Sequence, residues 1–177
     1  MAQWGFMVNT NNCVGCKACE VACKQRNGLK PGEARLRVVA SVESGTFPNV
    51  QVRNYSMACM HCASPACMEV CPANAIVKDE DGAVLGIRDK CIGCKACFFA
   101  CPFGVPSYRE EDGTMVKCDL CADRRAMGLD PACAHTCFYG GLKAGPLEEL
   151  SSELKESATS AMASASGATQ PSVMVIE

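Results

Sequence analysis

The sequence offers few residues from which a conventional core or a nucleotide site could be built. Its 177 residues include one Trp, three Tyr and six Phe. No G-x-G-x-x-G or P-loop pattern occurs, so nothing predicts a flavin, nicotinamide or nucleotide site. The basic residues form no extended patch, so we expect no nucleic-acid partner. With so little aromatic content, we expect bound metal to supply part of the folding free energy.

The chain also has few features that would address it to a membrane. Its first residues, Met-Ala-Gln-Trp-Gly-Phe-Met-Val, contain no basic n-region, no apolar h-region and no twin-arginine pair. No window approaches the about 18 consecutive apolar residues that a transmembrane helix needs. We therefore expect no direct membrane span, and any location at a membrane or outside the cytoplasm would depend on other subunits.

What the chain has in excess is cysteine, with 16 residues. They fall into four groups of four, and three of these groups have closely similar spacing. The groups are Cys13-x2-Cys16-x2-Cys19-x3-Cys23, Cys59-x2-Cys62-x4-Cys67-x3-Cys71-Pro72, Cys91-x2-Cys94-x2-Cys97-x3-Cys101-Pro102 and Cys118-x2-Cys121-x11-Cys133-x3-Cys137. The third has the bacterial ferredoxin pattern, in which three cysteines bind one [4Fe–4S] cluster and the fourth binds a neighbouring cluster.

Four groups of four therefore predict four [4Fe–4S] clusters, with each pair of groups exchanging its last cysteine. Spacing alone does not fix which groups pair. The second and third groups are adjacent and both end in Cys-Pro, so we pair them as an inner unit, which leaves the first and fourth as an outer unit. The predicted metal ligands are Cys13, Cys16, Cys19 and Cys137 for cluster a; Cys23, Cys118, Cys121 and Cys133 for cluster b; Cys59, Cys62, Cys67 and Cys101 for cluster c; and Cys71, Cys91, Cys94 and Cys97 for cluster d.

Other uses of these cysteines fit less well. The fourth group in isolation would suit a tetrahedral zinc site, but it stands beside three ferredoxin-type groups. A disulfide-rich secreted domain would not require such regular gaps. A radical-SAM site needs C-x3-C-x2-C, and Arg26, Asn74, Gly104 and Gly140 stand where its third cysteine would be. His61 and His135 lie among complete cysteine sets, so we expect structural or hydrogen-bonding histidines rather than ligands.

The formal charge of −2 counts every cysteine as neutral, whereas thiolate-bound clusters are anionic. Several basic residues in or beside the cysteine groups are candidates to offset that charge, with ordinary solvation as the alternative. They are Lys17, Lys24, Lys90, Lys95, Lys117, Arg124 and Arg125.

The segments between the cysteine groups predict short strands. We expect a strand at Trp4–Asn9 and an insertion hairpin within residues 24–58, with strands at Leu36–Val42 and Val50–Tyr55 that pack on the core or on a partner. Similar hairpins, with Asp81-Gly82 and Asp112-Gly113 as turn signals, follow the second and third groups and form an internal repeat. We also expect a short amphipathic helix at 146–155, a Ser/Ala-rich linker at 157–170 and a strand or docking peptide at 172–176.

The predicted fold is thus α+β, with two ferredoxin-like [4Fe–4S] units related by the internal repeat, β-hairpin insertions and an extended C-terminal tail. Residues 1–23 and 118–145 form the outer unit, 24–58 the insertion hairpin, 59–117 the inner unit and 146–177 a partly flexible tail that docks on a partner. The C-terminal strand covers a neighbouring subunit or folds back onto its own core; the sequence leaves both open.

No group of residues composes a catalytic pair, which leaves electron transfer as the predicted function. The order of the four groups resembles the four-cluster electron-transfer subunit of the dimethyl sulfoxide reductase family. Further resemblance lies in Gln3-Trp-Gly-Phe6, Cys101-Pro-Phe-Gly-Val-Pro-Ser-Tyr108, Lys117-Cys-Asp-Leu-Cys121 with Asp123-Arg124, and residues 171–176. Phe138, in place of a proline common after the last cysteine, and the Ser/Ala-rich tail depart from the family.

The resemblance implies a non-catalytic subunit that relays electrons through four clusters to or from a molybdopterin catalytic subunit of an anaerobic oxidoreductase. It also implies, in many relatives, a membrane-anchor subunit that exchanges electrons with quinol. We expect a location at the membrane through these partners, on the extracytoplasmic face by co-export with the catalytic subunit, and a cytoplasmic complex fits equally. The alternative function is a free-standing polyferredoxin carrier, against which the insertion and the C-terminal strand argue.

Overall fold

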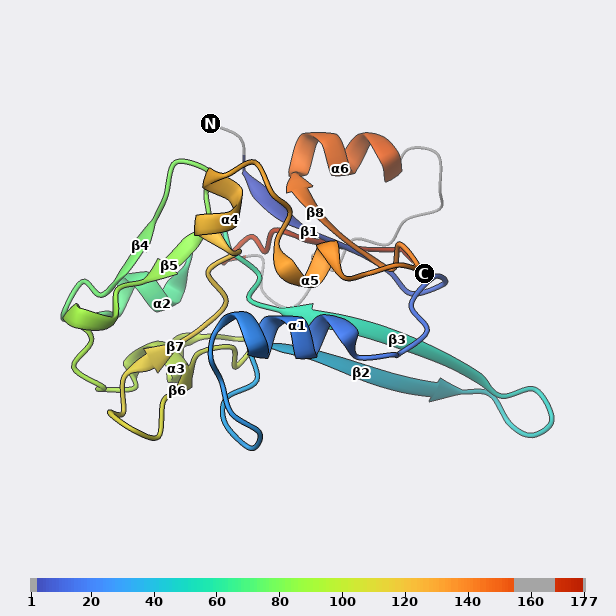
Figure 1. Cartoon of the computed structure of the whole chain (residues 1–177), viewed down its shortest axis with the longest axis horizontal. Helices are drawn as coiled ribbons and strands as arrows, with labels where there is room; N and C mark the ends of the chain where they lie inside the picture. Colours follow the sequence, from blue (N-terminus) through green and yellow to red (C-terminus); the bar gives the residue numbers. More distant parts are fainter. Residues whose placement is uncertain (1–2, 155–167, 177) are drawn as a thin grey trace.

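The computed structural model describes residues 3–154 and 168–176 and has an α+β fold, as expected. Short helices and small sheets alternate along the chain (Figure 1). The strands are β1 (Trp4–Asn9), β2 (Arg37–Ser44), β3 (Gln51–Ala58), β4 (Ile76–Lys78), β5 (Val84–Gly86), β6 (Ser107–Tyr108), β7 (Met115–Val116), β8 (Leu142–Pro146) and β9 (Val173–Ile176). The helices are α1 (Ala18–Arg26), α2 (Ala66–Glu69), α3 (Ala96–Ala100), α4 (Ala122–Ala126), α5 (Ala132–His135) and α6 (Leu147–Leu154), with a 3₁₀ turn η1 (Arg88–Lys90).

A three-stranded sheet joins the two ends of the chain. Its order is β8-β1-β9, with β1 antiparallel to β8 and parallel to β9. Side chains alternate across β1: Phe6 and Val8 enter the main core, whereas Met7 packs with Leu150 of α6 and Ile176 of β9. The strand predicted at Trp4–Asn9 is confirmed, and of the two positions left open for the C-terminal strand the structure has the second, against its own core.

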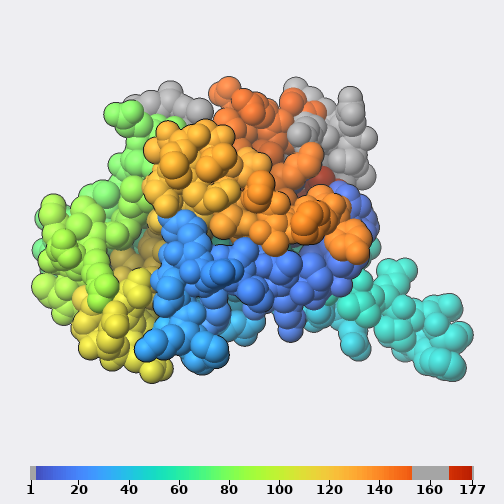
Figure 2. Space-filling model, viewed as in Figure 1, coloured from blue at the N-terminus to red at the C-terminus, as the bar shows by residue number. Residues whose placement is uncertain are grey.

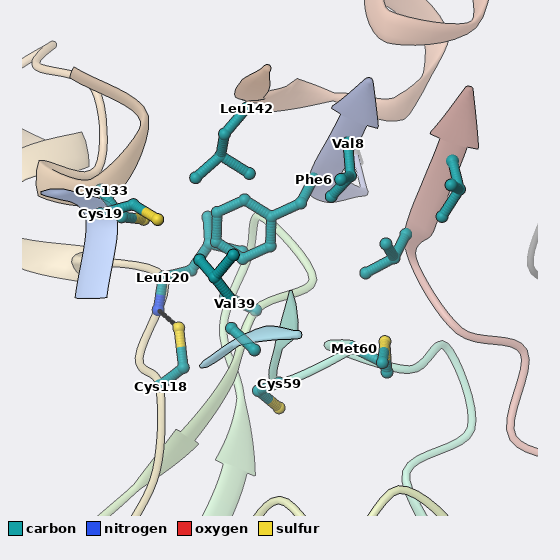
Figure 3. Close-up of a cluster of buried hydrophobic side chains, with 14 residues drawn as sticks. Phe6, Val8, Cys19, Val39, Cys59, Met60, Cys118, Leu120, Cys133 and Leu142 are labelled. Atoms are coloured by element: carbon teal, nitrogen blue, oxygen red, sulfur yellow. Dashed lines mark hydrogen bonds between the residues drawn. The ribbon is translucent and has the colours of Figure 1, made fainter. Parts of the chain in front are cut away.

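The main core lies under this sheet and contains cysteines as well as aliphatic side chains. Phe6 is 1% exposed and sits at its centre (Figure 3). Around the ring lie Leu120, Leu142 and Val39, and the sulfur atoms of Cys19, Cys118 and Cys133 appear at its margin (Figure 3). The core is therefore continuous with the cysteine groups.

The insertion contains the longest strand pair, β2 with β3. Its antiparallel register runs from Arg37 opposite Ala58 to Ser44 opposite Gln51. The predicted hairpin is confirmed, although each strand extends further towards the C-terminus than the pattern indicated. Its base is buried in the core, whereas its tip, with Phe47 at 92% exposure, projects beyond the rest of the molecule (Figures 1 and 2).

Two smaller hairpins follow the second and third cysteine groups, as the internal repeat predicted. One is β4 with β5 and the other is β6 with β7. In the first turn Asp79 accepts a hydrogen bond from the backbone N–H of Ala83 at 2.7 Å, and in the second Asp112 accepts one from Thr114 at 2.9 Å. The side-chain carboxylates thus replace backbone acceptors in both turns.

The helices pack in two pairs. Helix α1 of the first group packs against α5 of the fourth, and α2 of the second group packs against α3 of the third. Helix α6, which was predicted as amphipathic, covers β1 and β8. Most of the Ser/Ala-rich linker predicted at 157–170 lies outside the described residues.

Within residues 3–154 and 168–176, no helix has both the length and the apolar character that crossing a bilayer requires.

Candidate iron–sulfur centres

The same local structure surrounds all four cysteine groups. In every group the third cysteine is the second residue of a short helix and follows an alanine, as in Ala18-Cys19 of α1 and Ala96-Cys97 of α3. Cys67 occupies this place in α2 and Cys133 in α5. The helix start therefore fixes the third cysteine relative to the turn that precedes it, even where x4 or x11 replaces the two-residue gap.

A left-handed residue precedes the second cysteine of every group. Gly15 and Gly93 have φ of 69° and 67°, and His61 and Leu120 have φ of 41° and 53° at the corresponding places. Glycine adopts this conformation without steric cost, whereas His61 and Leu120 are held in it by burial, at 0% exposure each. Alternation of right- and left-handed residues turns backbone N–H groups towards one side of a loop, which suits an anionic ligand.

One cavity is lined by the four cysteines predicted for cluster d. Cys71, Cys91, Cys94 and Cys97 line this small cavity together with residues from the β4–β7 region. The cysteines come from two different groups, because Cys71 is the last of the second group and the others open the third. The structure therefore brings this predicted set together around one space.

A second cavity is lined by the four cysteines predicted for cluster a. Cys13, Cys16, Cys19 and Cys137 all belong to its lining. Here too the fourth cysteine comes from another group, across the packed helices α1 and α5.

The cysteines predicted for cluster c are electrostatic neighbours. Burial raises the pKa of Cys67 to about 11, and the thiols of Cys59, Cys101 and Cys62 contribute in the same direction. Burial also raises the pKa of Cys62, with Cys59 and Cys101 adding to the effect. These mutual effects place the four sulfurs in one neighbourhood.

The cysteines predicted for cluster b are the most deeply buried set. Burial raises the pKa of Cys23 to about 12, with Cys133 and Cys121 adding to the effect. Burial likewise raises the pKa of Cys118 far above its usual value, and its thiol neighbours include Cys59, Cys133 and Cys23. Cys59 belongs to the set predicted for cluster c. The sets predicted for clusters b and c therefore adjoin at Cys118 and Cys59.

Backbone N–H groups point at several sulfur atoms. Ala75 donates to Cys71 Sγ at 3.2 Å and Met115 donates to Cys91 Sγ at 3.3 Å. Leu120 donates to Cys118 Sγ at 3.4 Å (Figure 3). Such hydrogen bonds stabilise thiolates and are among the features that set iron–sulfur reduction potentials.

Two hydroxyl groups contact the third cysteines of corresponding loops. Ser56 Oγ lies 3.3 Å from Cys19 Sγ, and Tyr108 Oη lies 3.5 Å from Cys97 Sγ. Burial and the neighbouring Cys97 thiol raise the pKa of Tyr108 above its usual value, so the phenol stays protonated and can donate to a thiolate. Tyr108 ends a sequence motif that carries the family resemblance, whereas nothing in the sequence indicated Ser56.

His61 has the structural role that was predicted for it. Its Nδ1 accepts a hydrogen bond from the backbone N–H of Val84 at 3.0 Å, which anchors the second cysteine group to β5. Its Nε2 has no hydrogen-bond partner among the described residues. Burial, and then the positive charges of Lys117, Arg125 and Arg37, lower its pKa, so the ring is neutral.

The basic residues suggested as counter-charges for the clusters differ in burial and in their partners. Lys117 is 5% exposed, and its ammonium group donates to the carbonyl oxygens of Val84 and Cys118. Arg125 is paired with Asp79 and Asp81, and Lys24 donates to two loop carbonyls. A further buried cation, Arg37, lies outside the cysteine groups and had no sequence indication.

These residues fit [4Fe–4S] clusters in chemistry and placement. All sixteen cysteines are free thiols. No three Cys, His, Asp or Glu side chains in the described part of the chain converge on a single metal ion. Cluster ligands need not converge in that way, because each of the four thiolates binds a different iron of the cube.

Comparison with known proteins gives two family matches. Residues 50–147 match the 4Fe-4S dicluster domain, and residues 4–25 match a 4Fe-4S binding domain. The first match covers more than half of the chain and includes the second, third and fourth cysteine groups.

Curated relatives resemble the chain over most of its length. It is 39% identical over 181 residues to the B subunit of anaerobic dimethyl sulfoxide reductase of Escherichia coli (strain K12), covering 98% of this chain and 88% of that protein. It is 37% identical to the thiosulfate reductase electron transfer subunit PhsB of Salmonella typhi, covering 83% and 78%. It is 34% identical to the formate dehydrogenase iron-sulfur subunit of Haemophilus influenzae, covering 81% of this chain and 52% of that protein.

Proposed function

Because this chain belongs to the family of iron–sulfur electron-transfer subunits that includes the B subunit of anaerobic dimethyl sulfoxide reductase, we propose that it relays electrons to or from the molybdopterin subunit of an oxidoreductase. The protein is not itself catalytic. Relatives named for dimethyl sulfoxide, thiosulfate and formate share this type of subunit, so the substrate is set by the catalytic partner.

One observation carries this function: cysteines from different groups of the sequence come together, because Cys71 lines one cavity with Cys91, Cys94 and Cys97, and Cys137 lines another with Cys13, Cys16 and Cys19. We assign the four [4Fe–4S] clusters to the four predicted cysteine sets. Cluster a is held by Cys13, Cys16, Cys19 and Cys137; b by Cys23, Cys118, Cys121 and Cys133; c by Cys59, Cys62, Cys67 and Cys101; and d by Cys71, Cys91, Cys94 and Cys97. When bound, these groups supply one-electron redox chemistry.

The fold buries several of the cysteines of these sites and packs together the helices that carry them. Burial that raises thiol pKa values, as at Cys23 and Cys67, makes iron binding displace protons during assembly. The packing of α1 on α5 and of α2 on α3 supports two ferredoxin-like units. We keep the outer unit at 1–23 with 118–145 and the inner unit at 59–117.

The two terminal sites differ from the middle ones in exposure. Cys16 of set a and Cys94 of set d are exposed, whereas all four cysteines of set b are buried. Exposed apolar side chains surround both ends, among them Phe138 at 93% and Phe99 at 82%. We assign entry and exit of electrons to these two ends, with the apolar side chains in contact with partners.

The partners follow from the same family membership. We propose a molybdopterin-containing catalytic subunit at one end and a membrane-anchor subunit that exchanges electrons with quinol at the other. The exposed tip of the β2–β3 hairpin and residues 146–177 are further docking segments in this proposal, although β9 itself pairs with β1. The proposed location is the extracytoplasmic face of the membrane, reached with the catalytic subunit, with a cytoplasmic complex as the alternative.

The test is an iron and acid-labile sulfide analysis of anaerobically purified protein, with EPR after dithionite reduction. The expected result is about sixteen of each per chain, with signals from several interacting [4Fe–4S] clusters. Zinc with little sulfide would contradict the proposal.

The role as a subunit is tested separately by purification of the native protein. The expected result is co-purification with a molybdenum-containing polypeptide in a stable complex. A lasting monomer on size exclusion would instead favour the free polyferredoxin carrier.

A further inference from the structure

Arg37 is a buried cation at the base of β2 that lacks a carboxylate partner. It is 2% exposed, and its Nη1 donates to the Ser56 carbonyl oxygen at 2.9 Å and to Ser56 Oγ at 3.1 Å. The guanidinium carbon lies 4.3 Å from the centroid of the Phe6 ring. Nε and Nη2 have no hydrogen-bond partner among the described residues, and no Asp or Glu in that part of the chain forms an ion pair with Arg37.

This arrangement is unfavourable for the polypeptide alone. A buried charge without a counter-ion costs much more free energy than a paired one, and buried unpaired N–H groups add to that cost. The chain elsewhere supplies such partners: Arg125, whose side chain is 3% exposed, is paired with Asp79 and Asp81. Arg37 therefore requires an anion that the side-chain carboxylates do not provide.

Arg37 contacts Ser56 and Phe6 directly, and cysteines of sets a and b lie beyond these two residues. Ser56, which accepts from Arg37, also contacts Cys19 of set a at 3.3 Å. Burial acts to lower the pKa of Arg37, and the nearby thiols of Cys133, Cys118, Cys19 and Cys23 act to raise it; three of these four belong to set b. Figure 3 shows Phe6, against which Arg37 stacks, with Cys19, Cys118 and Cys133 around it.

We propose that Arg37 is the shared counter-ion of clusters a and b, and that its charge raises the reduction potentials of both. This rests on the proposed function, because the anion is the thiolate-bound cluster. Reduction adds one negative charge to a site, so a nearby buried cation stabilises the reduced form more than the oxidised form. Arg37 is a positioning residue in this role, since it is not a ligand.

The experiment compares three variants of the full-length protein, purified with its clusters, by EPR-monitored redox titration. Arg37→Gln removes the charge and keeps a hydrogen-bonding side chain. Arg37→Lys keeps the charge. Arg35→Gln is the matched control, because Arg35 is two residues away in the same segment, half exposed, and paired with Glu20.

In Arg37→Gln we expect two of the four EPR components to become harder to reduce. The expected change is at least tenfold in the reduction equilibrium, which is about 59 mV for one electron. Arg37→Lys keeps the charge, so it should shift these components less than Arg37→Gln does, although an ammonium group cannot reproduce the two hydrogen bonds to Ser56 and the stacking on Phe6. Arg35→Gln should not differ from the wild type. Equal shifts of all four components, or the same shift in Arg37→Gln and Arg37→Lys, would overturn the proposal.

If Arg37→Gln loses clusters, an iron analysis of the variants distinguishes a role of the positive charge from a role of side-chain shape. If the charge retains the outer clusters, iron falls from about sixteen to about eight per chain in Arg37→Gln and stays complete in Arg37→Lys. Equal iron loss in both variants would show that shape, not charge, matters, and would overturn the proposal. Wild-type protein without iron would instead refute the proposed function itself.

Discussion

The segments Cys13–Cys19 and Cys91–Cys97 share the pattern Cys-x-Gly-Cys-Lys-Ala-Cys but lie in different surroundings. Their backbones correspond: the glycines have φ of 69° and 67°, and the lysines that follow the second cysteines have φ of 61° and 64°. Each then begins a helix one residue before its third cysteine. The shared residues at identical spacing thus produce the same cysteine-bearing turn twice.

The neighbours of the two turns are different. Cys19 faces the hydroxyl of Ser56, which is fixed by the buried guanidinium of Arg37. Cys97 faces the hydroxyl of Tyr108, whose ring lies 5.5 Å from the Lys95 ammonium group. The turn therefore places the cysteines, whereas strands from distant parts of the sequence determine the charge and hydrogen bonding around them.

The largest effect is expected from removing the corresponding cysteines. Cys19→Ser and Cys97→Ser should each remove one EPR component, a different one in each variant, because the assigned ligand sets do not share these residues. Iron content should fall by up to about four atoms per chain in each variant. Loss of the same component in both variants would contradict the assignment of Cys19 and Cys97 to separate clusters.

The next effect concerns the left-handed glycines. Gly15→Ala and Gly93→Ala should each lower the free energy of unfolding by about 1–2 kcal/mol through backbone strain alone. Gly93→Ala should cost more, because its Cβ would lie 2.9 Å from the backbone carbonyl oxygen of Gly113. The Cβ of Gly15→Ala would meet the Asn54 side chain at 2.8 Å, which can shift at the cost of its hydrogen bonds with Ser41 and Cys13.

The matched control is Gly104→Ala, where φ is 59° and no atom lies within 4 Å of the added Cβ. Thermal unfolding of the loaded protein, followed by loss of cluster absorbance, should rank the three variants as Gly93, Gly15 and Gly104 from least to most stable. If Gly104→Ala were instead the least stable variant, the close contacts of Gly93 with Gly113 and of Gly15 with Asn54 would be contradicted.

A smaller effect is expected at the hydroxyl groups. Ser56→Ala and Tyr108→Phe each delete a hydroxyl that contacts one sulfur, so each should lower the reduction potential of one cluster. A net hydrogen bond of about 1 kcal/mol corresponds to a few tens of millivolts for one electron. Redox titration should show the shift in different EPR components for the two variants. A change in the reduction potential of cluster d in Ser56→Ala would contradict the assignment of Ser56 to the surroundings of Cys19 in cluster a.

The smallest effect is expected at the surface ion pairs near the two turns. Arg35 pairs with Glu20 next to the first, and Arg88 pairs with Glu111 and Asp112 near the second. Both arginine side chains are 52% exposed, so solvent screens these pairs. Arg35→Gln and Arg88→Gln should leave iron content and potentials unchanged, and a clear change in either would show longer-range coupling.

Many of the strands and helices were predictable, because local sequence patterns specify them. The strands at the N-terminus and in the insertion, the two small hairpins and the helix after Pro146 follow from alternation, turn residues and amphipathic spacing. The strand ends in the insertion were less predictable, because alternation continues past Val42 and Tyr55 only through pairing with the opposite strand.

Part of the site was equally predictable, and part was not. The convergence of Cys71 with Cys91, Cys94 and Cys97 follows from spacing and from the Cys-Pro endings, whereas the full assignment of sixteen ligands to four clusters stays a prediction. The left-handed turns at His61 and Leu120 were not indicated, because glycine marks this conformation only in the first and third groups. Their left-handed backbones are imposed by burial and by contacts such as the hydrogen bond from Val84 to His61.

The sequence alone determined the chemistry that this protein performs, because thiolate number and spacing are local properties that select the type of metal group. The tertiary structure alone decided what surrounds each group. Arg37 and Ser56 belong to the insertion, far from Cys118 and Cys133 in the sequence, and only the packing of β2 and β3 against α1 and the core brings them together. Burial then gives their charge and hydrogen bonds an effect that water would screen on the surface.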